Sequence, residues 1–221
     1  MRFKNIKGAI GPEIARYLWL SGAMIALALF IRITHELREQ ELDRFDDLLL
    51  RSFVRVRVPW LTVVAKDVTI LGSFVITAMV SAIAITALWL ARNRPAALQI
   101  VVSLGGATIW VHLLKNVIQR IRPNAFSPLV QASGFSYPSG HSLTAAAVYL
   151  TLAIVCRRFI KTGVWRTIVT SAALLIIILV GSSRVYLGVH YPTDVASGIL
   201  FGAGWAFLAA AWFNAIAPTA G

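Results

Sequence analysis

The chain has 221 residues, of which 58% are hydrophobic and only 14% are charged, and its mean hydropathy is +0.75. A soluble domain of this length needs far more polar surface, so the composition indicates one integral membrane domain over residues 1–221. The net charge of +12 does not indicate a nucleic-acid partner, because the basic residues are scattered between apolar runs rather than gathered on one face with aromatic residues.

Several apolar runs are long enough to cross a bilayer as helices. We predict an all-α fold, a bundle of six transmembrane helices. The fourth run is short, and we expect its helix to begin earlier, within residues 139–141. The predicted helices cover residues 17–33, 68–90, 97–114, 142–156, 164–182 and 195–213.

A long polar stretch, residues 34–67, separates the first two predicted helices. Within it Leu42, Phe45, Leu49 and Phe53 recur at spacings of three and four, with charged residues between them. This pattern favours an amphipathic helix on the membrane surface, and a solvated connecting helix is the alternative. Trp60 follows at a position that suits an interfacial anchor.

The charges in the short loops predict the orientation. The loops after the second and fourth predicted helices contain basic residues and no acidic ones: Arg92, Arg94, Arg157, Arg158 and Lys161. Such loops lie in the cytoplasm. We therefore expect a multi-pass protein of the inner (plasma) membrane with both termini cytoplasmic. Three polar clusters, at residues 115–123, 138–141 and 183–194, would then meet on the outer face.

The first and third clusters supply cations. Lys115, Arg122 and Arg184 would bind a phosphate group without a metal, because arginine's planar fork fits two phosphate oxygens and lysine acts as a point charge. Arg120 is interpreted differently, as a side chain that extends to the membrane surface.

The second cluster, Pro138-Ser139-Gly140-His141, precedes an apolar helix. The unpaired backbone N–H groups of a helix N-terminus bind anions. Gly140 allows the backbone to approach a phosphate closely, and Ser139 offers a hydroxyl donor. An ordinary serine cap is the alternative interpretation.

Two histidines complete the predicted site. Asp194 follows His190 closely enough to hydrogen-bond one ring nitrogen, which would leave the other nitrogen free to attack phosphorus. His141 can protonate the leaving oxygen and later activate water. His35 is predicted to be a surface residue, and His112, one helical turn before Lys115, a packing or supporting residue.

The sequence offers no metal site. Its single cysteine, Cys156, excludes an intramolecular disulfide and most zinc sites, and no carboxylate cluster suits magnesium. We expect no cofactor.

The three clusters together resemble the signature of the type 2 phosphatidic acid phosphatases, which share their site with the vanadium haloperoxidases. The motifs are Lys115-x6-Arg122-Pro123, then Pro138-Ser139-Gly140-His141, then Ser183-Arg184-x5-His190-x3-Asp194. The match covers residues 115–194, and no signature position is missing.

This resemblance implies a metal-independent phosphatase that acts on lipid phosphates at the outer leaflet through a phosphohistidine. It implies that His190 is the nucleophile, Asp194 orients it and His141 is the acid and base. The residues that it implies for phosphate binding are Lys115, Arg122, Ser139, Gly140, His141 and Arg184.

The lipid itself stays open: undecaprenyl diphosphate, phosphatidylglycerophosphate, phosphatidate and a lipid A phosphate all fit. Transfer of the phosphoryl group to an acceptor hydroxyl instead of water is a second enzymatic hypothesis. A non-catalytic lipid-binding or transport protein is the third, and the loss of a catalytic histidine would favour it; both histidines are present. The haloperoxidases are soluble, unlike this chain. The oligomeric state is not readable from the sequence.

Overall fold

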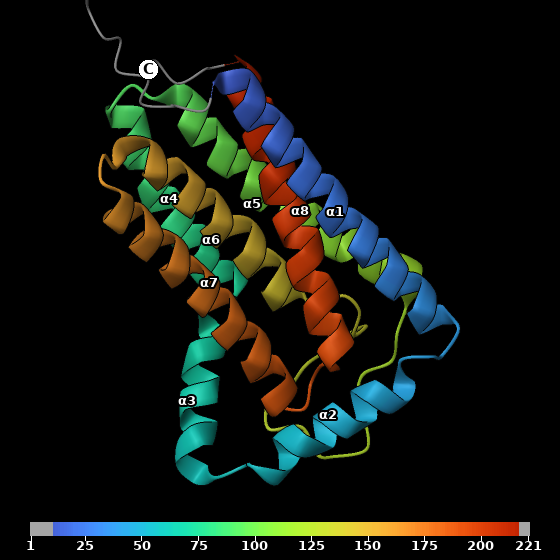
Figure 1. Ribbon diagram of the computed structural model, residues 1–221. Helices are drawn as coiled ribbons and strands as arrows, with labels where there is room; N and C mark the ends of the chain where they lie inside the picture. The colour runs from blue at the N-terminus through green and yellow to red at the C-terminus, as the bar shows by residue number, and fades with distance from the viewer. Residues whose placement is uncertain (1–10, 217–221) are drawn as a thin grey trace, which may run out of the picture.

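The computed structural model describes residues 11–216, and it contains eight α-helices and no strand in that range (Figure 1). The longest connection, residues 119–139, joins α5 to α6. The helices are α1 (Pro12–Arg38), α2 (Asp43–Arg55), α3 (Pro59–Ile70), α4 (Phe74–Leu90), α5 (Arg94–Ile118), α6 (Gly140–Phe159), α7 (Gly163–Tyr186) and α8 (Pro192–Ile216).

Helix α6 lies at the centre of the bundle and contacts α5, α7 and α8. Two glycines of α8 allow the close approach of α8 to α6. A Cβ atom on Gly198 would lie 2.6 Å from the carbonyl oxygen of Ser139, and one on Gly202 would overlap the carbonyl oxygen of Leu143. Because a larger side chain would push the two helices apart, these glycines fix the start of α6 beside the start of α8.

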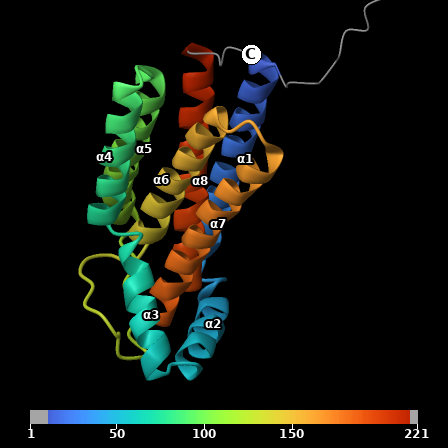
Figure 2. The ribbon, with the colours of Figure 1, turned by 90° about the vertical axis from the view of Figure 1, so that its left-hand side faces the viewer.

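Two shorter helices, α2 and α3, lie at one end of the bundle. Figures 1 and 2 show both at the end opposite the start of α1 and the end of α8. Leu50 of α2 is buried against Val185 of α7 and Val195 of α8. Helix α2 therefore packs over the ends of the two helices whose polar residues form the third sequence cluster.

The prediction of one continuous helix over residues 68–90 is wrong. The helix is interrupted between Ile70 and Phe74, and the axes of α3 and α4 differ in direction by 48°. Ser73 starts the new helix, because its hydroxyl oxygen accepts a hydrogen bond from the backbone N–H of Ile76 at 3.4 Å. At Gly72 a Cβ atom would lie 3.0 Å from the carbonyl oxygen of His141, so the break brings the chain against the start of α6.

Within residues 11–216, five helices are long and apolar enough to cross a bilayer: α1, α5, α6, α7 and α8. The bent pair of α3 and α4 would make a sixth span if the two cross together. The all-α prediction is confirmed, and the other five predicted helices each lie within an observed one. Helix α6 begins at Gly140, as the short fourth apolar run led us to expect.

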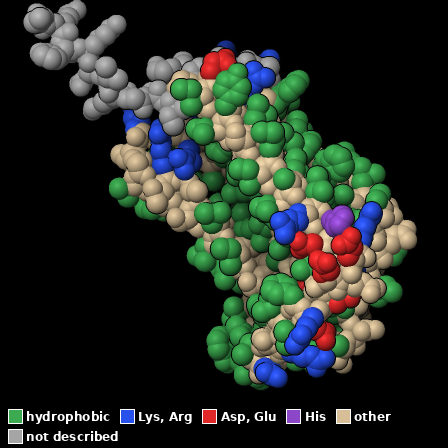
Figure 3. All heavy atoms as spheres, turned by 45° about the vertical axis from the view of Figure 1, so that its right-hand side comes forward, with side chains coloured by type: hydrophobic (Ala, Val, Ile, Leu, Met, Phe, Trp, Pro, Cys, Tyr) green, Lys and Arg blue, Asp and Glu red, His purple; other side chains and the backbone are tan. Residues whose placement is uncertain are grey.

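Large apolar side chains cover the flank of the bundle, whereas acidic side chains gather near the junction of α1 and α2 (Figure 3). Exposed apolar side chains are found on several helices of the bundle: Met24 of α1 is 64% exposed, and Ile83 of α4 and Val164 of α7 are each 70% exposed. A soluble protein rarely leaves so much contiguous apolar surface in water, so this flank fits the hydrocarbon of a bilayer.

Candidate active site

The ends of four helices converge on one cavity of about 650 Å³. Lys115 lies in the last turn of α5, His141 in the first turn of α6 and Arg184 in the last turn of α7. The structure brings six of the eight predicted site residues to this cavity: Lys115, Arg122, Gly140, His141, Arg184 and His190. Asp194 lies behind His190, and Ser139 is buried beside the cavity.

His190 lies in the turn before α8 with its side chain only 2% exposed. Its Nδ1 is 3.4 Å from Oδ2 of Asp194, and its Nε2 is 3.2 Å from Nη1 of Arg122. Burial lowers the pKa of His190 to about 4, although Asp194 opposes the shift. The imidazole is therefore neutral near pH 7. With the proton on Nδ1, the Nε2 lone pair faces Nη1 of Arg122 at the edge of the cavity.

Asp194 is fully buried in the first turn of α8. Its Oδ2 accepts hydrogen bonds from the backbone N–H of Tyr191 at 2.9 Å and from the hydroxyl of Ser136. Its Oδ1 accepts from Nη1 of Arg120 at 2.7 Å. The carboxylate is thus held on both oxygens, which is how a buried charge avoids a large desolvation cost.

Ser136 is a member of this site that the sequence did not reveal. Its hydroxyl also lies 3.5 Å from Nδ1 of His190, so it contacts both the imidazole and the carboxylate. A lone serine in the segment between two helices carries no spacing or charge signal, because only the folded path of residues 119–139 brings it to α8.

Arg122 is fixed by backbone carbonyl groups. It donates from Nε to Gly134 at 3.0 Å, from Nη2 to Ser133 at 2.9 Å and from Nη1 to Val189 at 2.7 Å. Burial lowers the pKa of Arg122, and the charge of Asp194 opposes this shift. The guanidinium is therefore held rigidly against the His190 ring before any ligand binds.

The other two cations keep capacity for an anion. Nζ of Lys115 donates to the carbonyl of Phe135. Nη1 of Arg184 donates to the hydroxyl of Thr69 at 2.9 Å, whereas its buried Nε has no hydrogen-bond partner among the residues that the structure describes. A buried guanidinium with an unused donor favours an anionic ligand in the cavity.

The start of α6 forms the floor of the cavity. At Gly140 a Cβ atom would lie 3.1 Å from Cγ1 of Val111 and 4.0 Å from Cε of Lys115, so glycine leaves room beside the lysine. The Ser139 hydroxyl accepts a hydrogen bond from the Ser142 hydroxyl at 3.0 Å. The backbone N–H of Ser139 donates to the backbone carbonyl of Asp194 at 2.9 Å. In this structure Ser139 therefore joins α6 to α8, and it is not among the residues that line the cavity.

Arg120 does not extend to the membrane surface, and that prediction is wrong. Its side chain is only 13% exposed and pairs with Asp46 and Asp194, each at 2.7 Å. Burial lowers the pKa of Arg120, but the two carboxylates outweigh burial, so the net shift is upward. The sequence did not show this because Asp46 lies 74 residues away.

The remaining histidines differ from each other. The side chain of His35 is 70% exposed, as predicted for a surface residue. His112 lines the cavity one turn before Lys115. In the described part of the chain, no group of three or more His, Cys, Asp or Glu side chains is placed to hold a metal ion.

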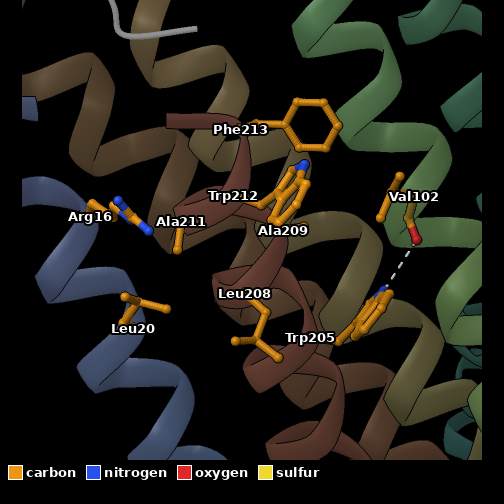
Figure 4. Close-up of a pocket in the computed structure, with 9 residues that line it drawn as sticks. All are labelled: Arg16, Leu20, Val102, Trp205, Leu208, Ala209, Ala211, Trp212 and Phe213. Carbon is orange, nitrogen blue, oxygen red and sulfur yellow. Dashed lines mark hydrogen bonds between the residues drawn. The ribbon is translucent and has the colours of Figure 1, made fainter. Parts of the chain in front are cut away.

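A second pocket, of about 430 Å³, lies between α1, α5 and α8 near the opposite end of the bundle (Figure 4). Its lining is apolar apart from Arg16, and Trp205 donates from its indole N–H to the carbonyl of Val102 at 3.2 Å. Acid, base and nucleophile groups are found among the residues that line the first cavity and not among those that line this one.

A helical membrane bundle with two histidines and three cations around one cavity defines a membrane-embedded phosphatase, since such a set of side chains fits the charge and shape of a phosphate ester. The family follows from comparison with known proteins: residues 96–217 match the PAP2 superfamily, and the chain belongs to it.

Several relatives support this membership. The chain is 33% identical over 174 residues to phosphatidylglycerophosphatase B of Bacillus subtilis (strain 168), which covers 78% of this chain and 85% of the relative. It is 33% identical over 122 residues to the undecaprenyl-diphosphatase of Sulfolobus acidocaldarius, covering 53% and 55%. The crystal structure of a transmembrane PAP2 type phosphatidylglycerolphosphate phosphatase from Bacillus subtilis superposes with a TM-score of 0.84 at 30% identity, covering 90% of this chain and 98% of that one.

Proposed function

We propose that this protein is a lipid phosphate phosphatase that works through a phosphohistidine on His190. One observation carries the proposal: Nε2 of His190 lies 3.2 Å from Nη1 of Arg122, at a cavity that His141, Lys115 and Arg184 also line. A nucleophile, a second histidine and three cations around one space match what phosphoryl transfer needs, which is positioning and charge stabilisation.

In the first step Nε2 of His190 attacks phosphorus, and the bond from phosphorus to the lipid oxygen breaks. The negative charge of the bound phosphate favours the protonated form of His141. His141 then gives its proton to that oxygen, so the lipid leaves as an alcohol, or as a monophosphate if the substrate is a diphosphate. Arg122, Lys115 and Arg184 neutralise the equatorial oxygens, and the N–H groups at the start of α6, at Gly140 and beyond, add donors. Asp194 holds the Nδ1 proton of His190 and stabilises the positive charge that develops on the ring.

In the second step neutral His141 takes a proton from water, and the water oxygen attacks phosphorus. The bond to Nε2 breaks, inorganic phosphate leaves and His190 returns to its neutral state. Transfer to an acceptor hydroxyl would follow the same course with a different nucleophile. We favour water because a hydroxyl acceptor requires a second binding site. A non-catalytic lipid carrier would not need the buried His190–Asp194 pair.

The helices described above support one domain with six spans, counting α3 and α4 together as one. We place α2 on the membrane surface, since Phe45, Leu48 and Leu49 are 51%, 58% and 36% exposed on the side away from the bundle. The basic loops then put both termini in the cytoplasm and the cavity on the outer face of the inner membrane.

The lipid is chosen by comparison with relatives. The Bacillus relative is named a phosphatidylglycerophosphatase, and the Sulfolobus relative an undecaprenyl-diphosphatase. We propose phosphatidylglycerophosphate as the first candidate, because that relative matches most of this chain. Phosphate release from phosphatidylglycerophosphate, phosphatidate, undecaprenyl diphosphate and lipid A, each in mixed micelles with purified protein, tests this choice. Release from none of the four would contradict the proposed function.

Hydrolysis should survive a strong chelator. The three cations that line the cavity, Lys115, Arg122 and Arg184, can neutralise the phosphate oxygens, so the reaction should need no divalent ion. We expect wild-type phosphate release to change by less than about twofold in excess EDTA. Complete loss in EDTA, restored by added magnesium, would rule out the metal-free mechanism.

The cavity should be reachable from outside the cell. In a Cys156→Ser background, Ala125→Cys in the α5–α6 segment should react with an impermeant thiol reagent in intact cells, and Lys161→Cys between α6 and α7 should not. Both positions are exposed, so protection of Lys161→Cys reports the membrane barrier. Labelling after permeabilisation serves as the control, and the reverse pattern in intact cells would invert the topology.

A further inference from the structure

A buried carboxylate on α2 caps the helix that carries the proposed catalytic aspartate. Asp46 is fully buried, although α2 lies at the end of the bundle. Its Oδ1 accepts from the backbone N–H of Thr193 at 2.9 Å, and its Oδ2 accepts from the Thr193 hydroxyl at 2.5 Å. Thr193 lies in the first turn of α8, so Asp46 satisfies an N–H group of that turn from 147 residues away in sequence.

Arg120 connects this cap to the site. Its Nη2 donates to Oδ2 of Asp46 at 2.7 Å, and its Nη1 donates to Oδ1 of Asp194 at 2.7 Å and to the Thr193 hydroxyl at 2.9 Å. Its guanidinium carbon lies 4.1 Å from the centre of the Tyr191 ring. One planar cation therefore binds two buried carboxylates while it stacks on the residue that follows His190.

The network divides the two oxygens of Asp194 between different partners. Oδ1 is bound by Arg120, so Oδ2 is left to face Nδ1 of His190 and the Ser136 hydroxyl. Rotation of the carboxylate would break the bond to Arg120 and leave a buried cation poorly paired, which is costly. The orientation of Asp194 thus depends on groups that do not touch the cavity.

We propose that Asp46 and Arg120 are positioning residues that set the orientation of Asp194 toward His190 and couple the packing of α2 to the reactivity of the site. This inference rests on the proposed function. Neither side chain lines the cavity, so both act through Asp194. A bulky lipid that bound beside α2 would therefore contact the helix that orients Asp194 toward His190.

The pH dependence separates positioning from simple support of the fold. The groups that face the His190 ring are Asp194 and Ser136, Arg122 from the α5–α6 segment, Arg184 from α7 and His141 from α6. Arg120 reaches the ring only through Asp194. Removing its charge leaves Asp194 free to stabilise the imidazolium, so the pKa of His190 should rise. Removing the charge of Asp46 directs Arg120 more fully to Asp194, so that pKa should not rise.

The test compares four full-length variants with the wild type: Arg120→Gln, Arg120→Lys, Asp46→Asn and, as a matched control, Asp47→Asn. Asp47 is the neighbouring acid on α2 and pairs with Arg51 at 3.1 Å on the exposed side. The substrate is whichever of the four lipid phosphates named above the wild type hydrolyses fastest. It is presented in mixed micelles, and kcat and KM are measured from pH 4 to 9. The thermal unfolding midpoint of each variant reports whether it is folded.

We expect kcat to fall by about 10- to 100-fold in Arg120→Gln and Asp46→Asn, with KM within about twofold, because the orientation of His190 and not phosphate binding is lost. The fall of kcat/KM at low pH (the acid limb), which reports protonation of His190, should move to higher pH in Arg120→Gln and not in Asp46→Asn. Arg120→Lys should recover part of the rate, since it keeps the charge but cannot bind both carboxylates with a planar fork. Asp47→Asn should match the wild type.

Unchanged kcat and an unchanged acid limb in folded Arg120→Gln and Asp46→Asn would overturn the inference, and so would a shift of the limb in the same direction in both. If Arg120→Gln does not fold, the test rests on kcat in Arg120→Lys and Asp46→Asn, and unchanged kcat in both would overturn the inference. A wild type without phosphate release or phosphohistidine would instead overturn the proposed function, so the two failures are distinguishable.

Discussion

Replacing His190 with alanine is expected to lower kcat for lipid phosphate hydrolysis by about 10⁴–10⁶-fold, the scale seen when a covalent nucleophile is removed. The cavity would keep Arg122, Lys115 and Arg184, so substrate should still bind. Without Nε2 no phosphohistidine can form. No positioned group replaces the missing nucleophile, so direct attack by water should be slow. Phosphate release and a binding measurement on the same purified variant test both statements.

His35→Ala is the matched control for this variant. The side chain of His35 is 70% exposed on α1, and His35 is not among the residues that line the cavity. It should retain wild-type kcat. A His190→Ala enzyme with more than about a tenth of wild-type kcat would show that the attacking group is not His190.

Replacing His141 with alanine is expected to stop the reaction at a different stage. Loss of a general acid and base costs about 10²–10⁴-fold in turnover. A lipid alkoxide leaves poorly without a proton, whereas an aryl phosphate leaves without one. With an aryl phosphate His190 should therefore still be phosphorylated, and the phosphoenzyme should persist because no base activates water.

The measurement for this variant is a rapid-quench time course with an aryl phosphate. We expect a burst of phenol of about one equivalent per site, followed by slow release of phosphate. Equal and parallel slowing of both products, without a burst, would mean that His141 does not act separately in the two steps. Asp194→Asn provides a comparison, since it should slow the burst itself.

Much of the fold could be predicted from the sequence, because a bilayer imposes helices of a defined length on any chain that crosses it. The spacing of the three polar clusters relative to the apolar runs also placed Lys115, His141 and Arg184 at the same end of the bundle. Counting helix crossings is enough for this inference, since each residue lies at the end of its own helix.

The parts that the sequence did not predict depend on contacts between distant residues. The break at residues 71–73 lies within an apolar run, and only the folded structure shows that Gly72 lies against the start of α6. Arg120 was predicted to be a surface residue because its partner Asp46 could not be recognised from the sequence. The apolar spacing around Asp46 predicts only a helix on the membrane surface. Ser136 has no motif at all, and Ser139 showed its hydroxyl contact to Ser142 only in the folded structure.

The central claim is that His190 carries the phosphoryl group. The most direct test is to mix wild-type enzyme with a radiolabelled aryl phosphate, quench in alkali within milliseconds, and locate the label by peptide mass spectrometry. The mechanism predicts an alkali-stable, acid-labile phosphate on Nε2 of His190, present in His141→Ala and absent in His190→Ala. Label on another residue, or a wild-type level of label in His190→Ala, would contradict it.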